Sequence, residues 1–347
     1  MPLEPPNKTA FPLITAMIVV RNEAYRIRQC IASLLEQDYP SDCYEIIVVD
    51  GESEDKTLQT VKEEYTLHQT TAKTLPELRI ISNPKHILAS GWNLGIQAAR
   101  GDYVVRLDAH MFVRSDFLRK VIEVMEQVGD AACVGGSITT LGDTKSGEII
   151  AEALTSPFGV GGSKFRYSKT AGYVDTVAAG LYKKSVFYEI GFLNEKLVRT
   201  QDNDLHRRMR DAGMKFYLDP EIHYYYYARN SYHKLIKQMY LNGKWSMINF
   251  LSRPGRMPLR YFVPMAFVLT ELVALLGGII FWPAWVFAVI GLLLHLICGS
   301  YFAVKRTKKI SHRIQLPIIF LSMHIFYGIG SLTGPLNYIQ FRSSKSG

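Results

Sequence analysis

Hydrophobic and polar positions divide the chain into two unlike parts. Up to about residue 255, short apolar runs alternate with stretches rich in charged residues, whereas beyond Arg260 the apolar runs become long. Four short runs rich in β-branched residues lack the alternation of half-buried strands, so they predict strands that are buried on both faces of a sheet. These runs are 14–20, 45–50, 78–82 and 103–108.

Helical patterns lie between these runs, over 25–37, 55–67 and 90–99. Strand and helix recur about every 30 residues, which predicts βαβ units and a mostly parallel α/β sheet. In such sheets, ligands bind beyond the carboxyl ends of the strands. We therefore expect the functional residues to follow directly after the strands.

Three apolar runs near the C-terminus are each long enough for a membrane-spanning helix. The runs 261–281, 284–304 and 316–336 carry between them only Glu271, His295 and His324 as acidic, basic or histidine residues. They predict a membrane domain over 259–347, in which the first two runs cross the bilayer and meet at a tight turn. The third run contains several glycines and a proline, so it is expected either to span the bilayer or to be re-entrant or interfacial.

Composition and charge support this division. The chain is 48% apolar, its 40 Lys and Arg residues outnumber 31 Asp and Glu residues, and its mean hydropathy is +0.03, an average of a polar and an apolar part. Basic residues cluster at 253–260 and 305–313, beside the apolar runs. This placement predicts that these segments lie on the cytoplasmic face of the inner (plasma) membrane of the cell, and it argues against nucleic-acid binding. Four scattered cysteines predict reduced thiols rather than a disulfide framework or a zinc site.

Two further segments bear on the membrane. The apolar stretch 11–20 lacks a basic leader and a small-residue cleavage site, so it predicts a buried strand and not a signal peptide. The segment 231–258 mixes basic residues, such as Lys234 and Lys237, with apolar ones, such as Leu235 and Met239. It is expected to form an amphipathic helix on an anionic membrane surface, or alternatively a helix packed on the domain formed by 1–230.

Polar clusters follow three of the predicted strands. They are 21–23 (Arg-Asn-Glu), 50–57 and 108–110 (Asp-Ala-His). In an extended segment, residues i and i+2 project to the same side, so Asp108 and His110 can reach one divalent ion. Mg²⁺ or Mn²⁺ suits such a site, with the imidazole favouring Mn²⁺ slightly, although Asp108 could instead cap the strand.

A helix is expected from Thr200, as N-cap, to Gly213, as C-cap. Asp202 lies in its first turn. There the carboxylate either stabilises the helix dipole or acts as a general base, and the residues alone leave both roles open.

The ordered motifs resemble those of glycosyltransferase family 2, inverting enzymes with the GT-A fold. They are 19–23 (Val-Val-Arg-Asn-Glu), 48–57 (Val-Val-Asp-Gly-x-Ser-x-Asp-x-Thr), 107–110 (Leu-Asp-Ala-His) and 201–205 (Gln-Asp-Asn-Asp-Leu), and the resemblance covers about 13–245. The segments 158–166, 174–176 and 200–202 further resemble the succinoglycan-type glucosyltransferases of exopolysaccharide assembly. The resemblance implies a GT-A domain followed by C-terminal transmembrane helices.

The resemblance also implies roles for individual residues. Asp202 corresponds to the catalytic base, with Gln201 in place of the preceding Glu, and Asp108 and His110 correspond to the metal-binding motif. The expected donor-binding residues are Val20, Asn22, Glu23, Asp50, Ser53, Asn93, Arg106 and Ala109, and the expected acceptor-binding residues are Gln201, Asp204, Arg229, Gln238 and Trp245.

The chain departs from the family pattern at two places. Many members have Ala-Arg-Asn on the third helix, where the Arg contacts the donor diphosphate, but residues 90–93 are Ser-Gly-Trp-Asn. The diphosphate then needs another cation, either the metal alone, Arg106 or a later basic residue. The Gln-x-x-Arg-Trp motif of processive synthases is broken, since Gln238 lies well before Lys244-Trp245. This favours addition of a single sugar.

The function that follows from the resemblance is that of a membrane-anchored inverting hexosyltransferase. It is expected to use a UDP-sugar, most simply UDP-glucose, and to glycosylate a polyprenyl-diphosphate-linked oligosaccharide in bacterial exopolysaccharide synthesis. Two alternatives are a processive polysaccharide synthase and a catalytically inactive scaffold of a polysaccharide assembly complex.

Overall fold

The computed structural model describes residues 11–71, 74–253 and 258–343. The chain forms two compact units, which we call the sheet unit and the helical unit. Their segments interleave along the sequence, so neither unit is one continuous stretch. The sheet unit comprises Met1–Ser137, Lys169–Glu195 and Leu205–Tyr224, and the helical unit comprises Ile138–Ser168, Lys196–Asp204 and Tyr225–Gly347.

Parallel strands form one half of the sheet. The described residues give a nine-stranded sheet in the order β3-β2-β1-β4-β8-β6-β9-β5, with β7 paired to β9. The first four strands are parallel, as the sequence predicts, and two of them have the predicted bounds. They are β1 (Ile14–Val20), β2 (Tyr44–Asp50), β3 (Glu77–Ser82) and β4 (Tyr103–Asp108).

The register of these strands brings their carboxyl ends together. Asp50 of β2 pairs with Val20 of β1 on one side and with Ser82 of β3 on the other. Val19 of β1 pairs with Asp108 of β4. The residues that follow β1, β2 and β4 therefore start from one edge of the sheet, where the βαβ topology places ligands.

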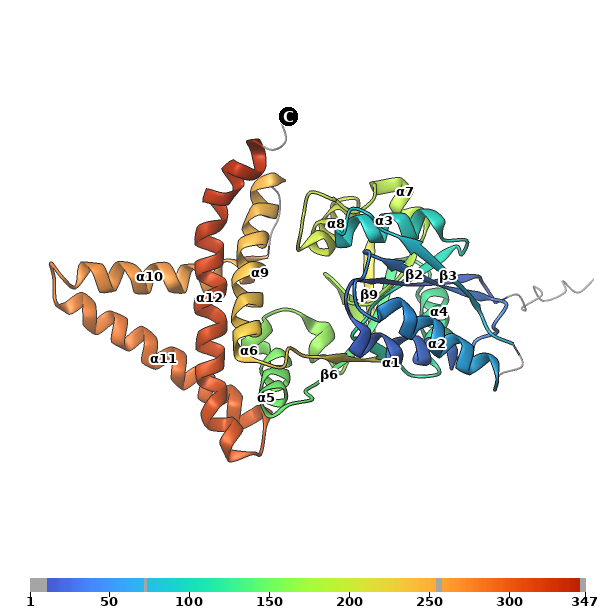
Figure 1. The fold of residues 1–347 in the computed structure, drawn as a ribbon. Helices are drawn as coiled ribbons and strands as arrows, with labels where there is room; N and C mark the ends of the chain where they lie inside the picture. Colours follow the sequence, from blue (N-terminus) through green and yellow to red (C-terminus); the bar gives the residue numbers. More distant parts are fainter. Residues whose placement is uncertain (1–10, 72–73, 254–257, 344–347) are drawn as a thin grey trace, which may run out of the picture. The chain divides into compact units, whose positions relative to one another are not determined.

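Burial explains the missing alternation in two of the strands. Every residue of β1 and of β2 is buried, as expected for strands covered on both faces. The same expectation is wrong for β3, which is partly exposed because it is the edge strand of the sheet. Figure 1 shows α3 on one face of the sheet and α1, α2 and α4 on the other. These helices are α1 (Ala24–Leu35), α2 (Thr57–Gln69), α3 (Leu88–Ala98) and α4 (Phe117–Val128).

Two glycines let α3 lie very close to β1. A Cβ on Gly95 would lie 2.2 Å from Cε of Met17, and a Cβ on Gly91 would lie 2.5 Å from Cγ1 of Val19. Side chains at these positions would therefore push the helix away from the sheet. This close approach fixes the segment that contains Trp92 and Asn93 above the end of β1.

The remaining elements of the first two-thirds of the chain are shorter. The strands β4 and β8, β6 and β8, and β7 and β9 pair antiparallel. The strands are β5 (Met111–Val113), β6 (Ala131–Leu141), β7 (Gly172–Val174), β8 (Leu181–Lys183) and β9 (Lys215–Tyr227), and the helices are α5 (Lys145–Leu154), α6 (Pro157–Val160), α7 (Ser185–Ile190) and α8 (Gln201–Asp211).

Four helices dominate the helical unit. They are α9 (Tyr232–Ser252), α10 (Val263–Gly277), α11 (Pro283–Arg306) and α12 (Ile310–Ser343). Among the described residues, α11 and Ile310–Ile339 of α12 are long and apolar enough to cross a membrane. The helix expected over 261–281 is shorter than predicted, because the chain turns after Gly277. Part of the predicted interfacial segment, 254–257, lies outside the described residues.

The helices α9 and α12 run side by side and in the same direction (Figure 1). Glycines allow their backbones to meet: a Cβ on Gly243 would lie 2.0 Å from the carbonyl oxygen of Tyr327, and a Cβ on Gly330 would lie 2.0 Å from that of Tyr240. The Tyr327 hydroxyl also donates to Ser246 Oγ at 3.1 Å. One face of α9 is thus buried against α12.

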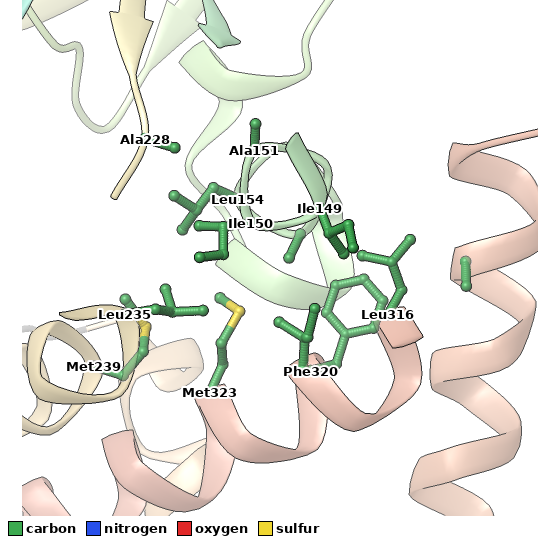
Figure 2. Close-up of a cluster of buried hydrophobic side chains, with 13 residues drawn as sticks. Ile149, Ile150, Ala151, Leu154, Ala228, Leu235, Met239, Leu316, Phe320 and Met323 are labelled. Atoms are coloured by element: carbon green, nitrogen blue, oxygen red, sulfur yellow. The ribbon is translucent and has the colours of Figure 1, made fainter. Parts of the chain in front are cut away.

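An apolar cluster joins α5 to this helix pair. Figure 2 shows Phe320 and Met323 of α12 meeting Ile150 of α5 and Leu235 of α9. Each of these four side chains is almost fully buried. Burial of this kind stabilises a domain by about 1.5–3 kcal/mol per large apolar side chain, so the cluster fixes α5 on the helix pair.

Two histidines attach α6 to the long apolar helices. His324 Nε2 lies 2.9 Å from the carbonyl oxygen of Phe158, and His324 Nδ1 lies 2.8 Å from Nε2 of His295. The two histidines of the long apolar helices therefore pair with each other. Glu271 lies against α11 at Gly291, where an added Cβ would be 2.3 Å from Glu271 Oε1.

The close approach of α9 and α12 yields a stability prediction. Gly243→Ala is expected to destabilise the folded protein by about 1–3 kcal/mol, because the new methyl group overlaps the Tyr327 carbonyl. Gly277→Ala is the matched control, since its Cβ would meet only the Cβ of Ala284 at 3.8 Å. Thermal unfolding of the purified protein in detergent measures both. Equal melting temperatures for the two variants would show that the glycine contact is not needed.

Candidate active site

Unusual backbone conformations mark the edge of the sheet where the parallel strands end. Asn22, Glu52 and His86 follow β1, β2 and β3, and each has a positive φ, of 55°, 54° and 55°. Residues other than glycine rarely adopt this region, and doing so costs about 1–3 kcal/mol each. Strain of this kind persists only where surrounding contacts hold it, and it collects at functional sites.

Hydrogen bonds between the first two strand-end loops provide such contacts. The backbone N–H of Asn22 donates to Ser53 Oγ at 3.0 Å, and Asn22 Oδ1 accepts from the N–H of Glu54 at 2.8 Å. The N–H of Glu23 donates to Thr57 Oγ1 at 2.9 Å. The loops after β1 and β2 are thus joined before any ligand arrives.

Asp50 organises the second loop. Its carboxylate is 4% exposed, and it accepts hydrogen bonds from the hydroxyl and the backbone N–H of Ser53, at 2.6 and 3.0 Å. The N–H of Gly51 donates to the carbonyl oxygen of Val20 at 2.8 Å, which ties this loop to β1. Val20, Asn22, Glu23, Asp50 and Ser53, all predicted to bind the donor, therefore belong to one hydrogen-bonded edge.

Asp108 ends β4, and His110 follows within a turn before β5. The residues between the two strands are not extended, so the sequence argument that i and i+2 share a side does not apply to them. Both side chains are partly exposed, whereas Ala109 between them is buried. Among the described residues, no group of three or more His, Cys, Asp or Glu side chains is placed to hold a metal ion. A metal site at Asp108 and His110 stays a prediction, in which substrate phosphates and water would supply the remaining ligands of Mg²⁺ or Mn²⁺.

Arg106 carries a positive charge to the same edge. Its guanidinium lies over the Trp92 ring, with Cζ 4.7 Å from the ring centroid, and its Nη2 is 3.8 Å from Asp108 Oδ1. The third helix lacks the arginine seen in many relatives, and Trp92 stands at that place. The structure puts an arginine from β4 directly over this tryptophan.

Asn93 makes contacts within the sheet unit that the sequence did not indicate. Its Nδ2 donates to the carbonyl oxygen of Leu193 and to Glu195 Oε1, both at 3.0 Å, and its Oδ1 accepts from the N–H of Leu193 at 2.9 Å. Lys85 donates to Glu195 at 2.7 Å and, with Asn93, lowers the pKa of that carboxyl. These bonds tie α3 to residues 193–195, and a role of Asn93 in donor binding stays a prediction.

The start of α8 belongs to the helical unit. Asp202 is partly exposed in the first turn, and its Oδ1 accepts from the N–H of Asn203 at 2.9 Å. The residue before the helix, Thr200, has a φ of 59°. Its hydroxyl was expected to cap α8, but it donates to the carbonyl oxygen of Trp245 at 3.2 Å. The N–H of Asp204 bonds to the Thr200 carbonyl instead, at 3.0 Å.

The polar face of α9 holds this segment. Asn242, Trp245 and Asn249 follow one another at helical spacing, so they share a face. Asn242 Oδ1 accepts from Nη1 of Arg199 at 3.2 Å, and Nδ2 of Asn249 donates to the carbonyl oxygen of Thr200 at 3.1 Å. Gln238 lies one turn before Asn242 on this face. Gln238 and Trp245, predicted from the resemblance to bind the acceptor, therefore share the α9 face that positions the start of α8.

Sequence reasoning missed Arg199 and the two asparagines of α9. Arg199 is partly buried. Its pKa is lowered first by this burial and then by the positive charge of Arg229. The available signal was an arginine three residues before the base candidate. It was overlooked because a lone arginine in a polar loop is ordinary on a protein surface.

The predicted site residues divide between the two units. The donor-binding and metal-binding candidates all lie in the sheet unit, and Asp202 with the acceptor-binding candidates lies in the helical unit. Each unit therefore carries one chemically coherent half of the predicted site. Asp204 is buried, with 5% of its surface exposed, as is Gln201, with 4% exposed.

Curated relatives match most of the chain. A dolichyl N-acetyl-alpha-D-glucosaminyl phosphate 3-beta-D-2,3-diacetamido-2,3-dideoxy-beta-D-glucuronosyltransferase of Methanococcus voltae is 28% identical over 92% of this chain and 96% of its own length. The succinoglycan biosynthesis protein ExoA of Rhizobium meliloti is 26% identical over 76% of this chain and 77% of its own.

Solved structures show the same fold. The mannosyltransferase PcManGT from Pyrobaculum calidifontis, in complex with GDP-Man and Mn²⁺, superposes with a TM-score of 0.61 at 16% identity, covering 95% of this chain and 88% of its own. Residues 1–349 of S. aureus TarS, in complex with UDP-GlcNAc, give a TM-score of 0.53 at 13% identity, over 94% and 92% of the two chains.

The fold and the motif order agree with these similarities. The mostly parallel sheet with polar strand ends is a GT-A fold, followed by two apolar helices that could span a membrane. The model of the family described as "Glycosyl transferase family 2" matches residues 15–191, which is more than half of the chain. The chain belongs to glycosyl transferase family 2.

Proposed function

We propose that the protein is an inverting glycosyltransferase that moves one sugar from a nucleotide donor to a lipid-linked saccharide at a membrane. The observation that supports this proposal is that the predicted donor residues and the predicted base lie in different units of the chain. Donor-type residues gather at one sheet edge, and a base candidate lies on a helix start that is held by a separate helical unit with long apolar helices.

The sheet unit would bind the donor. Asp50, Asn22 and Glu23 lie in loops that hydrogen bonds already fix, so little ordering is required when the nucleotide binds. Arg106, over Trp92, supplies the positive charge for the diphosphate that the third helix lacks. A nucleotide sugar is supported by the solved structures, of which one holds GDP-Man and another UDP-GlcNAc. We favour UDP-glucose because of the resemblance to succinoglycan-type enzymes.

Asp108 and His110 would hold a divalent ion. An oxygen and an imidazole ligand at the strand end, together with donor phosphates and water, fit Mn²⁺ or Mg²⁺. A cation held there neutralises negative charge that develops on the leaving diphosphate. The structural relative in complex with Mn²⁺ is consistent with this assignment.

Asp202 would act as the general base. Its carboxylate takes the proton from an acceptor hydroxyl, the oxygen forms a bond to the anomeric carbon, and the bond from that carbon to the nucleoside diphosphate breaks with its electron pair. A single displacement inverts the anomeric centre. One base suffices for this step, and the carboxylate pair of a glycoside hydrolase is not needed.

The helical unit supports attachment to a membrane. None of the residues of α10 is buried, and the turn between α10 and α11 exposes large apolar side chains: Ile279, Ile280 and Trp282 are 73%, 94% and 70% exposed. A continuous apolar surface of this kind is typical of a membrane contact. The basic segments beside the apolar helices support a cytoplasmic position of the sheet unit at a plasma membrane. The Methanococcus voltae relative, named for a dolichyl phosphate acceptor, supports a lipid-linked saccharide.

Asp202→Asn tests the base. Turnover is expected to fall by about 10²–10⁴-fold, because the amide cannot take a proton, while the Michaelis constant for the nucleotide sugar stays within about twofold. Asp211→Asn, at the exposed far end of α8, is the matched control and should keep wild-type turnover. The measurement is transfer of labelled sugar to lipid extract, after a screen of nucleotide sugars. Wild-type turnover in Asp202→Asn would refute the base, whereas a wild-type protein that transfers none of the screened sugars would favour the inactive-scaffold alternative.

His110→Ala tests the metal site. Removing a residue that only hydrogen-bonds to a metal ligand lowers metal affinity about 10–100-fold. Loss of a ligand itself is therefore expected to weaken Mn²⁺ binding at least as much. The binding is followed by electron paramagnetic resonance in the presence of UDP, and His233→Ala, at an exposed position of α9, serves as control. An unchanged Mn²⁺ titration in His110→Ala would remove this histidine from the site.

A further inference from the structure

Two arginines in the helical unit have no acidic partner among the residues that the structure describes. Arg199 precedes α8, and Arg229 follows β9. Both are partly buried. The hydrogen bond of Arg199 to the neutral Asn242, at 3.2 Å, does not compensate its charge. Burying a charge without an opposite charge is costly, so a pair of this kind is stable only if something else brings negative charge.

Arg199 and Arg229 are near enough for their positive charges to repel each other. The proximity is evident in the lowered pKa of Arg199, which results first from burial and then from the positive charge of Arg229. Tyr226 lies near the same place, and Arg166 is stacked over its ring, with Cζ 5.4 Å from the centroid. Arg166 and Arg199, from distant parts of the sequence, are thus both near Tyr226, which precedes Arg229 by three residues. Adjacent guanidinium groups are the preferred protein ligands of phosphate, because each can donate two parallel hydrogen bonds.

Unpartnered polar atoms occur in the same segments. Among the described residues, Oε1 of Gln201 and Oε1 of Gln238 are buried and have no hydrogen-bond partner. Gln201 follows Arg199 by two residues, and Gln238 lies one helical turn before Asn242, which holds Arg199. Buried polar atoms without partners are rare in native proteins and indicate a place where a ligand completes the hydrogen bonds.

We propose that Arg199 and Arg229 bind the phosphate group through which the acceptor saccharide is linked to its lipid. This inference rests on the proposed function and names the group that the helical unit recognises. The rival ligand for these arginines is the diphosphate of the nucleotide donor. The acceptor is favoured because Arg199, Thr200 and Asp202 form one segment that the polar face of α9 holds, so the arginine and the base are positioned together.

The opposite side of α9 places this site beside the apolar helices. Gly243 and Met247 face α12, whereas Asn242 and Trp245 face the segment before α8. A single helix therefore contacts an apolar helix with one side and the arginine segment with the other. A lipid phosphate has the matching character, since its charge lies at the end of an apolar chain.

Direct binding of farnesyl diphosphate to the full-length enzyme in detergent tests the proposal. Arg229→Gln and Arg199→Gln are expected to weaken this binding about ten- to a hundredfold, the range for a lost charge-assisted hydrogen bond. Arg199→Lys keeps the positive charge but cannot donate two parallel hydrogen bonds, so it should give an intermediate loss of affinity. Lys237→Gln removes one exposed charge from α9, and this variant should bind farnesyl diphosphate like wild type.

UDP binding in the presence of Mn²⁺ separates the acceptor from the donor. It should be unchanged in Arg229→Gln and Arg199→Gln. If these variants lose affinity for UDP and keep it for farnesyl diphosphate, the arginines serve the donor and the proposal is wrong. Wild-type affinity for farnesyl diphosphate in both variants would likewise overturn it. Circular dichroism and thermal unfolding of each variant establish that it is folded.

Kinetics with two acceptors links the site to transfer. One acceptor is a saccharide on a polyprenyl diphosphate, and the other is the same saccharide as an octyl glycoside, which has no phosphate. The arginine variants should lower kcat/KM about ten- to a hundredfold for the first and leave the second unchanged. An equal loss for both acceptors would contradict phosphate recognition. If the wild type glycosylates no lipid-linked saccharide, the proposed function fails, while binding of farnesyl diphosphate still reports on the arginine site.

Discussion

The close approach of α9 to α12 is the contact on which the helical unit depends. Glycines at 243 and 330 let the two backbones come close together, so one face of α9 is held against α12. With that face fixed, the opposite face presents Asn242 and Asn249 to the residues before α8. The position of the base candidate Asp202 is therefore set by packing between two helices that contain no catalytic group.

In the sheet unit, the residues at the strand ends are positioned by a different means. Its strands are buried and in register, and their carboxyl ends carry loops whose N–H groups bond to side chains of neighbouring loops. The strained residues Asn22 and Glu52 are held by this arrangement. The free energy that this strain costs is offset by the buried strands beneath it, and the result is a sheet edge whose loops are ordered in advance.

Charge is used differently in the two units. In the sheet unit, Arg106 lies between an aromatic ring and a carboxylate, so its charge is partly balanced. In the helical unit, Arg199 is partly buried near the positive charge of Arg229, with no acidic partner among the described residues, which lowers stability in the absence of a ligand. Stability given up at one place in this way is common at binding sites, because the ligand restores it.

Much of the fold follows from local pattern. The strand 14–20 and the helix after Thr200 were readable because burial on both faces of a sheet and a glycine just past a helix end leave clear traces in the sequence. The order of the strand-end motifs likewise indicated the family. The exposure of β3 was not readable, since nothing local tells an edge strand from a central one.

The sequence by itself determined that a parallel α/β sheet with polar strand ends is joined to long apolar helices, because periodicity and hydrophobicity are local properties. Only the tertiary structure decided that Thr200 bonds to α9 instead of capping α8, that Arg106 covers Trp92, and that Arg199 donates a hydrogen bond to Asn242. Each of these contacts joins residues from separate elements. Their partners are selected by how the elements pack, and packing depends on the whole chain at once.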